Sequence, residues 1–240
     1  MSSPNAPRML AYDIEASNLS ADFGIILCCG FREVGRGRTE VLSLHDYDEA
    51  DPIKAEKLLL KDMSKRLLDS DCWIAHFGKY FDGYFVNSRL LYHKLPTLPT
   101  NFPLVDTWRV MRNSLKLRNN RLATLQDFLG LKSSKTPITA EAWIRALAGQ
   151  ERAMREVINH CRKDVDVLVE AYLRLRPLIN EHPNHRLFND NAGCPLCGSH
   201  KVQYRGYHRT VTRAYRRVQC QECGKWSREA KPVKIVSTLR

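Results

Sequence analysis

The sequence predicts an α/β layer fold with a mixed sheet, followed by a small metal-stabilised β unit. Three strand-like segments near the start precede alternating helical and strand-like patterns, an order typical of α/β layer folds. Two Cys-x-x-Cys pairs near the end mark the second unit. With 240 residues and 43% hydrophobic content, the chain can bury one substantial core plus such a unit.

The first part of the chain carries the strands of the predicted sheet. Strand-like segments cover residues 8–14, 23–32 and 39–45, and we expect them to form an antiparallel meander. Pro52 opens a helix that runs to about residue 69, and the apolar segment 72–76 gives a fourth strand. A meander followed by this alternation indicates a mixed sheet with helices packed against it.

Helical patterns dominate the chain from there to about residue 176. We expect helices through residues 85–91 and at 122–129, 139–148 and 151–176. Apolar residues of the last helix recur at steps of three and four, so a continuous stripe faces the core. Breakers follow two of these helices, which should end there.

Two carboxylates end the first predicted strand. Asp13 and Glu15 are separated by one residue, so strand alternation places both on the same face. Without a counter-charge they would repel and raise each other's pKa. A solvated strand edge or a divalent cation such as Mg²⁺ or Mn²⁺ would accommodate such a pair, and the pair alone does not distinguish these alternatives.

Two further acids stand where a strand leads into a helix. Asp82 follows the fourth strand, at a position where open α/β sheets place functional groups. The alternative is an acid that complements the dipole of the helix it begins. Asp106 has the same setting, but no second acid accompanies it, so we expect it to cap a helix.

The long final helix carries a histidine and an acid beside its apolar stripe. His160 and Asp164 are four residues apart and therefore lie one turn apart. Asp166 points about 200° away from Asp164 around the helix axis and cannot join the same site. Helical geometry therefore selects Asp164, while His160 is either a functional group or a structural residue that hydrogen-bonds a neighbour.

Together these segments resemble a known family. Asp13-Ile14-Glu15, Phe81-Asp82 and His160-Cys161-Arg162-Lys163-Asp164 resemble the three motifs of the DEDD (DnaQ-like) 3′-5′ exonuclease superfamily, including its phage and bacterial members. The resemblance covers roughly residues 8–180 and implies an RNase H-like mixed sheet flanked by helices. Phe77-Gly78 departs from the Asn-Gly of many relatives, which leaves the contacts of that loop open.

The resemblance also implies phosphodiester hydrolysis with two catalytic Mg²⁺ or Mn²⁺ ions. Asp13, Glu15 and Asp164 would hold the ion that lowers the pKa of the attacking water. Asp13 would also bridge to a second ion, which Asp82 would hold through water. The family has a tyrosine four residues before its last acid or a histidine five before it, whereas His160 lies four before. We expect its imidazole to accept a proton, because imidazole titrates near neutral pH.

Charge separates the last quarter of the chain from the rest. Residues 183–240 carry 12 Lys and Arg against 3 Asp and Glu, a net +9 of the +12 on the whole chain. Residues 1–182 carry the remaining +3. The helical pattern ends in breakers near residues 182–184, and we place the domain boundary there. This excess indicates an anionic partner.

The eight cysteines divide in the same way. Four stand in apolar surroundings typical of buried thiols: Cys28, Cys29, Cys72 and Cys161. The others form two pairs at the spacing of a structural site for one Zn²⁺: Cys194, Cys197, Cys220 and Cys223. Disulfides are the alternative, which a cytosolic chain disfavours. So small a unit needs such a cross-link to fold, and the segment resembles the zinc ribbons of some transposases and phage nucleases.

Arginines and tyrosines are interleaved between the two cysteine pairs. Arginine forks suit phosphates, and tyrosine rings suit stacking on bases. A solvated charged face is the alternative. We expect a nucleic-acid-binding surface formed by Arg205, Tyr207, Arg209, Arg213, Tyr215, Arg216 and Arg217.

The expected function is a metal-dependent 3′-5′ exonuclease whose zinc ribbon binds the substrate, with DNA favoured over RNA. The alternatives are a structure-specific RNase H-like endonuclease and a non-catalytic nucleic-acid-binding protein whose acids are structural. No segment approaches the roughly 18 apolar residues of a membrane span, and the N-terminus lacks a signal-peptide pattern. We therefore expect no membrane partner and a location in the cytoplasm of a bacterium or a phage-infected host. Protein partners stay open.

Overall fold

The computed structural model describes residues 7–131, 138–188 and 193–233. The chain divides into two compact units, one formed by Arg8–Tyr172 and the other by Pro7 together with the chain from Leu173 onward. Within the described ranges, no helix combines the length and apolar character needed to cross a membrane.

The first unit is built on a five-stranded mixed sheet in the order β3-β2-β1-β4-β5. The predicted antiparallel meander consists of β1 (Met9–Ala16), β2 (Ile26–Glu33) and β3 (Glu40–Ser43). The strands β4 (Cys72–Ala75) and β5 (Leu104–Asp106) extend the sheet in parallel pairing beside β1. The predicted mixed sheet is confirmed.

Two strand ends differ from the sequence pattern. β2 starts after residue 23 because a turn occupies the preceding residues, where Gly24 N donates to Ser20 O at 2.9 Å. β3 ends at Ser43, whose backbone N donates to the side chain of Asp46 at 2.6 Å. The short 3-10 helix η1 (Leu44–Asp46) begins there. Local hydrogen bonds thus override the apolar pattern at both places.

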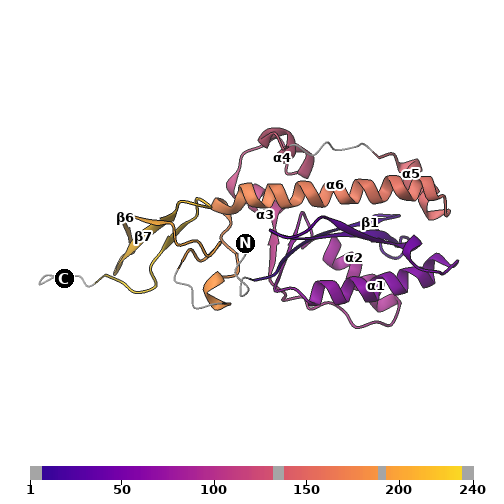
Figure 1. Ribbon diagram of the computed structural model, residues 1–240, viewed down its shortest axis with the longest axis horizontal. Helices are drawn as coiled ribbons and strands as arrows, with labels where there is room; N and C mark the ends of the chain where they lie inside the picture. Colours follow the sequence, from indigo (N-terminus) through magenta and orange to yellow (C-terminus); the bar gives the residue numbers. More distant parts are fainter. Residues whose placement is uncertain (1–6, 132–137, 189–192, 234–240) are drawn as a thin grey trace, which may run out of the picture. The chain divides into compact units, whose positions relative to one another are not determined.

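Helices cover both faces of this sheet. Figure 1 shows α1 (Pro52–Leu68) and α2 (Asp82–Tyr92) on one face and α6 (Glu151–Leu175) on the other. Large side chains of α1 and α2 form one core with Tyr12 and Trp73 of the sheet. Apolar residues of α6 form a second core against β2.

Three shorter helices of the described chain complete this unit: α3 (Thr107–Ser114), α4 (Leu122–Leu129) and α5 (Ala140–Leu147). Gly130 ends α4 with a φ of 60°, a left-handed conformation that glycine adopts without strain. Thr139 caps α5, because its hydroxyl accepts from Ala142 N. Both helix boundaries were predicted from the sequence.

Gly30 of β2 allows α6 to approach the sheet closely. A Cβ at this position would lie 2.8 Å from Val165 Cγ2 and 3.0 Å from Cys161 Sγ. Gly30 pairs with Asp13 of β1, and the Cys161 thiol donates to the Asp13 carbonyl at 3.6 Å. The missing side chain therefore brings α6 against the strand that carries the acid pair.

A buried ionic network joins α1 to α2. Glu56 of α1 is fully buried, and its carboxylate accepts from Arg89 Nε at 2.9 Å and Arg89 Nη2 at 2.6 Å. His93 Nε2 lies 2.7 Å from the same carboxylate, and Ile26 N of β2 donates to it at 2.8 Å. This network fixes both helices to one face of the sheet.

The Glu56→Gln variant should lower the free energy of unfolding by about 3–5 kcal/mol, because the Arg89 guanidinium would stay buried without its counter-charge. Urea unfolding followed by circular dichroism measures this loss. Glu40→Gln is the matched control, because Glu40 forms an exposed ion pair with Arg66 that is worth at most about 1 kcal/mol. Equal losses in both variants would contradict the role assigned to the buried network.

The second unit is a small antiparallel sheet in the order β6-β7-β8. Its strands are β6 (Val202–Arg209), β7 (Ala214–Cys220) and β8 (Trp226–Arg228). Two helical turns precede them, η2 (Arg176–Leu178) and η3 (His185–Leu187). Together with the cysteine cluster described below, this architecture agrees with the predicted small β zinc-ribbon domain.

This unit begins at Leu173, whereas the helix-breaking residues suggested a boundary at residue 183. The segment that follows α6 packs within it: Lys225 Nζ donates to Ile179 O at 2.5 Å and to Asn180 Oδ1 at 3.0 Å. A Cβ on Gly224 would lie 3.2 Å from Pro177. The end of a helical pattern therefore does not coincide with the limit of packing.

Candidate functional site

The end of β1 presents Asp13 and Glu15 toward α6. Glu15 Oε1 lies 3.9 Å from His160 Nε2 of α6. Burial raises the pKa of the Asp13 carboxyl well above its usual value, and the carboxylates of Glu15, Asp82 and Asp164 raise it further. The structure thus brings together the four acids that the sequence selected.

Asp82 reaches this cluster from the start of α2. It is only 4% exposed, and its Oδ1 accepts a hydrogen bond from Ile14 N at 3.3 Å. Because Ile14 stands between Asp13 and Glu15, this bond ties Asp82 to the acid pair. Burial raises the pKa of Asp82 from 3.8 to about 7, although backbone hydrogen bonds oppose the change.

Asp106 has two structural roles. Its Oδ1 accepts from Trp108 N at 3.0 Å, which confirms the predicted helix cap. The same carboxylate accepts from Phe77 N at 3.0 Å and Lys79 N at 3.1 Å. Asp106 therefore also fixes the loop that leads to Asp82, a role that spacing along the chain could not reveal.

Three aromatic rings meet on this loop. Ring centroids of Phe77 and Tyr80 lie 5.2 Å apart, and Trp108 lies 5.0 Å from Phe77 and 5.6 Å from Tyr80. Arg112 lies over the Trp108 ring at 5.2 Å. Phe77 and Tyr80 are 39% and 45% exposed. Sequence reasoning missed this aromatic cluster, because it forms only when the parallel strands β4 and β5 bring their outgoing segments together.

α6 contributes the remaining residues of the site, His160 and Asp164. His160 Nε2 lies 3.8 Å from Asp164 Oδ2, and both side chains are mostly buried. The carboxylate of Asp166 instead accepts from Arg32 Nη1 and from the Thr39 hydroxyl, each at 2.6 Å. Asp164 and His160 therefore belong to the acid cluster, whereas Asp166 lies elsewhere on the helix.

The donor set suits a hard divalent cation. Carboxylate oxygens are the ligands that Mg²⁺ and Mn²⁺ prefer, and a cation would relieve the repulsion that raises the pKa of Asp13. Cys161 Sγ also lies within 4.8 Å of ligand atoms of Asp13 and Glu15. Its hydrogen bond with Cys28 and its burial raise its pKa well above the usual value, so it stays a thiol. Because hard cations such as Mg²⁺ prefer oxygen ligands to sulfur, we expect Cys161 to pack beside the acid pair and not to bind the metal.

The raised pKa values predict how metal-free stability depends on pH. Between about pH 4 and pH 7, Asp82 is protonated in the folded protein and ionised in the unfolded chain. The folded state binds more protons there, so metal-free stability falls as the pH rises through this window. Mg²⁺ requires the ionised carboxylates, so its stabilising effect should be larger at about pH 8 than at about pH 5.

Thermal unfolding with and without Mg²⁺ at both pH values measures this effect. Asp82→Asn should flatten the pH dependence of the metal-free protein, because the amide does not titrate in this range. An equal gain in Tm from Mg²⁺ at both pH values would contradict the assignment of these carboxylates as ligands.

Comparison with known proteins agrees with the fold of the first unit. The sequence profile of the RNase H superfamily matches residues 10–175. The chain belongs to the RNase H superfamily. No curated protein matches it in sequence. Membership supports a nuclease function in general.

A similar solved structure is the family B DNA polymerase of the hyperthermophilic archaeon Pyrobaculum calidifontis. The TM-score is 0.53 at 14% sequence identity, and the similarity covers 78% of this chain. It spans only 28% of the polymerase chain. At this identity the likeness establishes the fold that this RNase H superfamily member shares with part of the polymerase.

The second unit of this RNase H superfamily protein gathers the four paired cysteines. Sγ atoms of Cys194 and Cys223 lie 3.7 Å apart, as do those of Cys197 and Cys220, and all four lie within 4.8 Å of one another. A tetrahedron with Zn–S bonds of about 2.3 Å has edges of about 3.8 Å, whereas a disulfide is about 2.0 Å long. The cluster can therefore hold one Zn²⁺. The other four cysteines are buried thiols, as predicted.

A bulge in β6 sorts the residues between the cysteine pairs onto two faces. The register pairs Tyr204 with Val218 and, after the bulge, Tyr207 with Arg216. Both tyrosines therefore share one face with Arg209 and Arg216, although strict alternation would separate them. We call this the Tyr204 face, defined by Tyr204, Tyr207, Arg209 and Arg216. Arg216 lies over the Tyr204 ring at 5.6 Å, and Arg209 lies over the Tyr207 ring at 5.5 Å.

The other predicted binding residues do not join this face. Tyr215 is only 9% exposed and lies beneath Arg228, whose guanidinium is 3.9 Å from the ring centroid. Arg217 shares the opposite face with Tyr215, whereas Arg205 lies at the bulge and Arg213 in the turn between β6 and β7. Stacking of a base on Tyr215 would require Arg228 to move.

Proposed function

We propose that this protein is a metal-dependent 3′-5′ exonuclease that hydrolyses phosphodiester bonds of nucleic acids, with DNA favoured over RNA. One observation carries the proposal: Asp13, Glu15, Asp82 and Asp164 converge at the end of β1 with His160 beside them. Burial and the repulsion of the neighbouring carboxylates raise the pKa of Asp13, an electrostatic arrangement typical of functional sites.

The four carboxylates would hold two Mg²⁺ or Mn²⁺ ions, which, when bound, activate water and stabilise the charge on the phosphate. Asp13 would be a ligand together with Glu15, Asp82 and Asp164, whose charges all contribute to its raised pKa. His160 Nε2 lies within 4 Å of Glu15 and Asp164, where it can accept the proton of the attacking water.

The aromatic cluster of Phe77, Tyr80 and Trp108 would position the substrate. Its exposed rings offer surfaces for base stacking, and Arg112 over the Trp108 ring adds a positive charge for the backbone. Asp106 holds the Phe77 and Lys79 amides, so the cluster is anchored directly before Asp82. Phe77 would thus contribute stacking where related motifs carry asparagine.

The second unit would hold the strand. The Tyr204 face combines two exposed rings with two guanidinium groups, a composition typical of surfaces that bind single strands. A structural Zn²⁺ on the four cysteines would stabilise this unit. We assign phosphodiester hydrolysis to the first, RNase H-like unit and binding of the strand to the basic second unit.

His160→Ala should lower kcat by about 10²- to 10⁴-fold with little change in Mg²⁺ affinity, because the variant removes a proton acceptor but no carboxylate ligand. His160→Tyr should recover part of this loss by orienting the water. Steady-state kinetics and a Mg²⁺ titration measure both quantities. A kcat for His160→Ala equal to that of the native protein would make His160 a structural residue.

A digestion assay tests the proposed function. The protein with Mg²⁺ should release mononucleotides from a linear strand labelled at its 5′ end, shortening it progressively, and should leave a closed circle intact. Cleavage of the circle would identify an endonuclease. Binding without cleavage of either substrate, with Mg²⁺ and with Mn²⁺, would identify a non-catalytic nucleic-acid-binding protein.

A further inference from the structure

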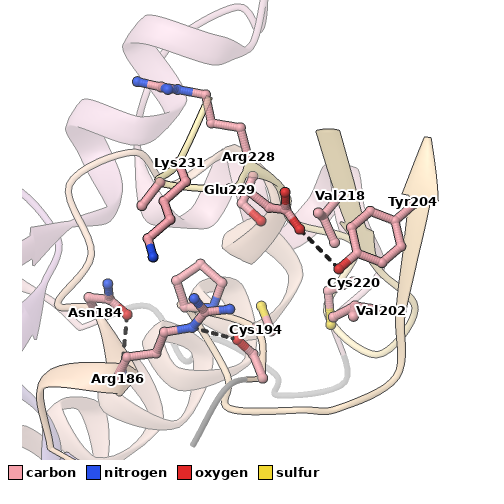
Figure 2. Close-up of a pocket in the computed structure, with 14 residues that line it drawn as sticks. Asn184, Arg186, Cys194, Val202, Tyr204, Val218, Cys220, Arg228, Glu229 and Lys231 are labelled. Atoms are coloured by element: carbon pink, nitrogen blue, oxygen red, sulfur yellow. Dashed lines mark hydrogen bonds between the residues drawn. The ribbon is translucent and has the colours of Figure 1, made fainter. Parts of the chain in front are cut away.

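The second unit contains a cavity of about 520 Å³ whose lining includes Cys194 and Cys220, one residue of each cysteine pair (Figure 2). Its apolar lining includes Val202, Val218 and Pro195. Tyr204 also lines it, with its hydroxyl donating to Glu229 Oε1 at 3.1 Å. A volume of this order is typical of small-ligand sites, which span about 300–1,000 Å³.

Two cationic side chains line the cavity across from the tyrosine. In the view of Figure 2, the Lys231 ammonium and the Arg186 guanidinium lie on the side opposite Tyr204. Arg186 is held in place, because its Nε donates to Gly193 O and its backbone N donates to Asn184 Oδ1, each at 3.0 Å. The arrangement therefore offers a positive end and a flat aromatic wall.

Two other charged side chains of the described lining, Arg228 and Glu229, leave this polarity intact. Arg228 lines the cavity, but its guanidinium is directed away and lies over the ring of Tyr215 at 3.9 Å. The Glu229 carboxylate is engaged by the Tyr204 hydroxyl, on the aromatic side. An anionic group is therefore favoured at Lys231 and Arg186 and disfavoured near Tyr204.

We infer that this cavity binds one nucleotide, with its phosphate at Lys231 and Arg186 and its base against Tyr204 and the apolar lining. A nucleotide unites the two features that the cavity separates, a phosphate and a flat ring that stacks on aromatic side chains. Tyr204 belongs both to the cavity and to the Tyr204 face, so a strand on that face could place one unit in it. That the nucleotide belongs to a strand rests on the proposed function; the cavity itself does not.

Binding of adenosine 5′-monophosphate to the full chain tests the inference. The Asp13→Asn background without added Mg²⁺ prevents binding at the acid cluster. Lys231→Glu should lower the affinity for the mononucleotide and for inorganic phosphate by about tenfold or more, which is the effect of losing one charge-assisted hydrogen bond. Tyr204→Ala should lower the affinity for the mononucleotide and for adenosine but leave the affinity for phosphate unchanged. Both residues are exposed, and Arg174→Glu, an exposed charge reversal outside the cavity, should change nothing.

A short fluorescein-labelled single strand distinguishes the source of the nucleotide. Displacement of the strand by the mononucleotide, with loss of strand affinity in Lys231→Glu, would assign the cavity to one unit of the strand. Mononucleotide binding without displacement would assign it to a free nucleotide. The inference is overturned if no mononucleotide binds or if phosphate binds as tightly as the mononucleotide. It is also overturned if Lys231→Glu lowers the affinity for an acidic peptide but not the affinity for the mononucleotide. If the native protein fails to digest any strand, the proposed function is wrong, whereas the binding results for the cavity remain valid.

Discussion

The Asp13→Asn variant is expected to lose cleavage by about 10³-fold or more while its affinity for nucleic acid changes little. Loss of this ligand removes several kcal/mol of transition-state stabilisation, and each 1.36 kcal/mol is a factor of about ten in rate. Burial and the three other acids of the cluster all raise the pKa of Asp13. Single-turnover digestion of an end-labelled strand measures the rate, and fluorescence anisotropy without Mg²⁺ measures binding.

Two variants on α6 provide the matched comparison. Asp164→Asn should resemble Asp13→Asn, because Asp164 lies 3.8 Å from His160 within the cluster. Asp166→Asn removes the same charge from the same helix but only loosens the contacts with Arg32 and Thr39, so cleavage should persist. Activity in Asp164→Asn together with inactivity in Asp166→Asn would refute the proposed site.

Most of the fold was predictable because its periodicity is local. Pro52 and the apolar spacing after it predicted a helix to about residue 69, and α1 spans Pro52–Leu68. The stripe on the last helix predicted α6, which spans Glu151–Leu175. The ends of β2 and β3 were less predictable, because side-chain and turn hydrogen bonds decide them.

The acids of the site were predictable from alternation and helical geometry, but what holds them together was not. Gly30 appears in the sequence as one residue of an apolar strand, and only the packing of Val165 and Cys161 on it shows why no side chain fits. The bulge after Tyr204 likewise has no local signal beyond Gly206, whose φ is 69°. Contacts of this kind depend on the register between strands that are distant in sequence.

Removal of zinc is expected to unfold the second unit and leave the first unit folded. Apart from Val202 at its start, β6 is exposed throughout, and the buried residues of this unit include Cys194, Leu196 and Cys220. The unit therefore has little core besides the metal cluster, and structural zinc contributes about 10–16 kcal/mol to such folds. Amide hydrogen exchange before and after treatment with a zinc-selective chelator locates the loss of protection.

Substrate binding should weaken at the same time and depend less steeply on salt. Each lost phosphate contact lowers the slope of log affinity against log salt by roughly 0.7 to 0.9, and residues 183–240 carry most of the excess positive charge. A salt series in the Asp13→Asn background compares the zinc-loaded protein, the chelated protein and a chain ending at Leu175, which lacks the segment packed on Lys225.

Two cysteine variants provide the control. Cys194→Ser removes a zinc ligand and should weaken substrate binding, whereas Cys72→Ser alters a buried thiol of the first unit and should not. Equal slopes and affinities in all forms would show that the second unit does not hold the substrate and would direct the search to a protein partner.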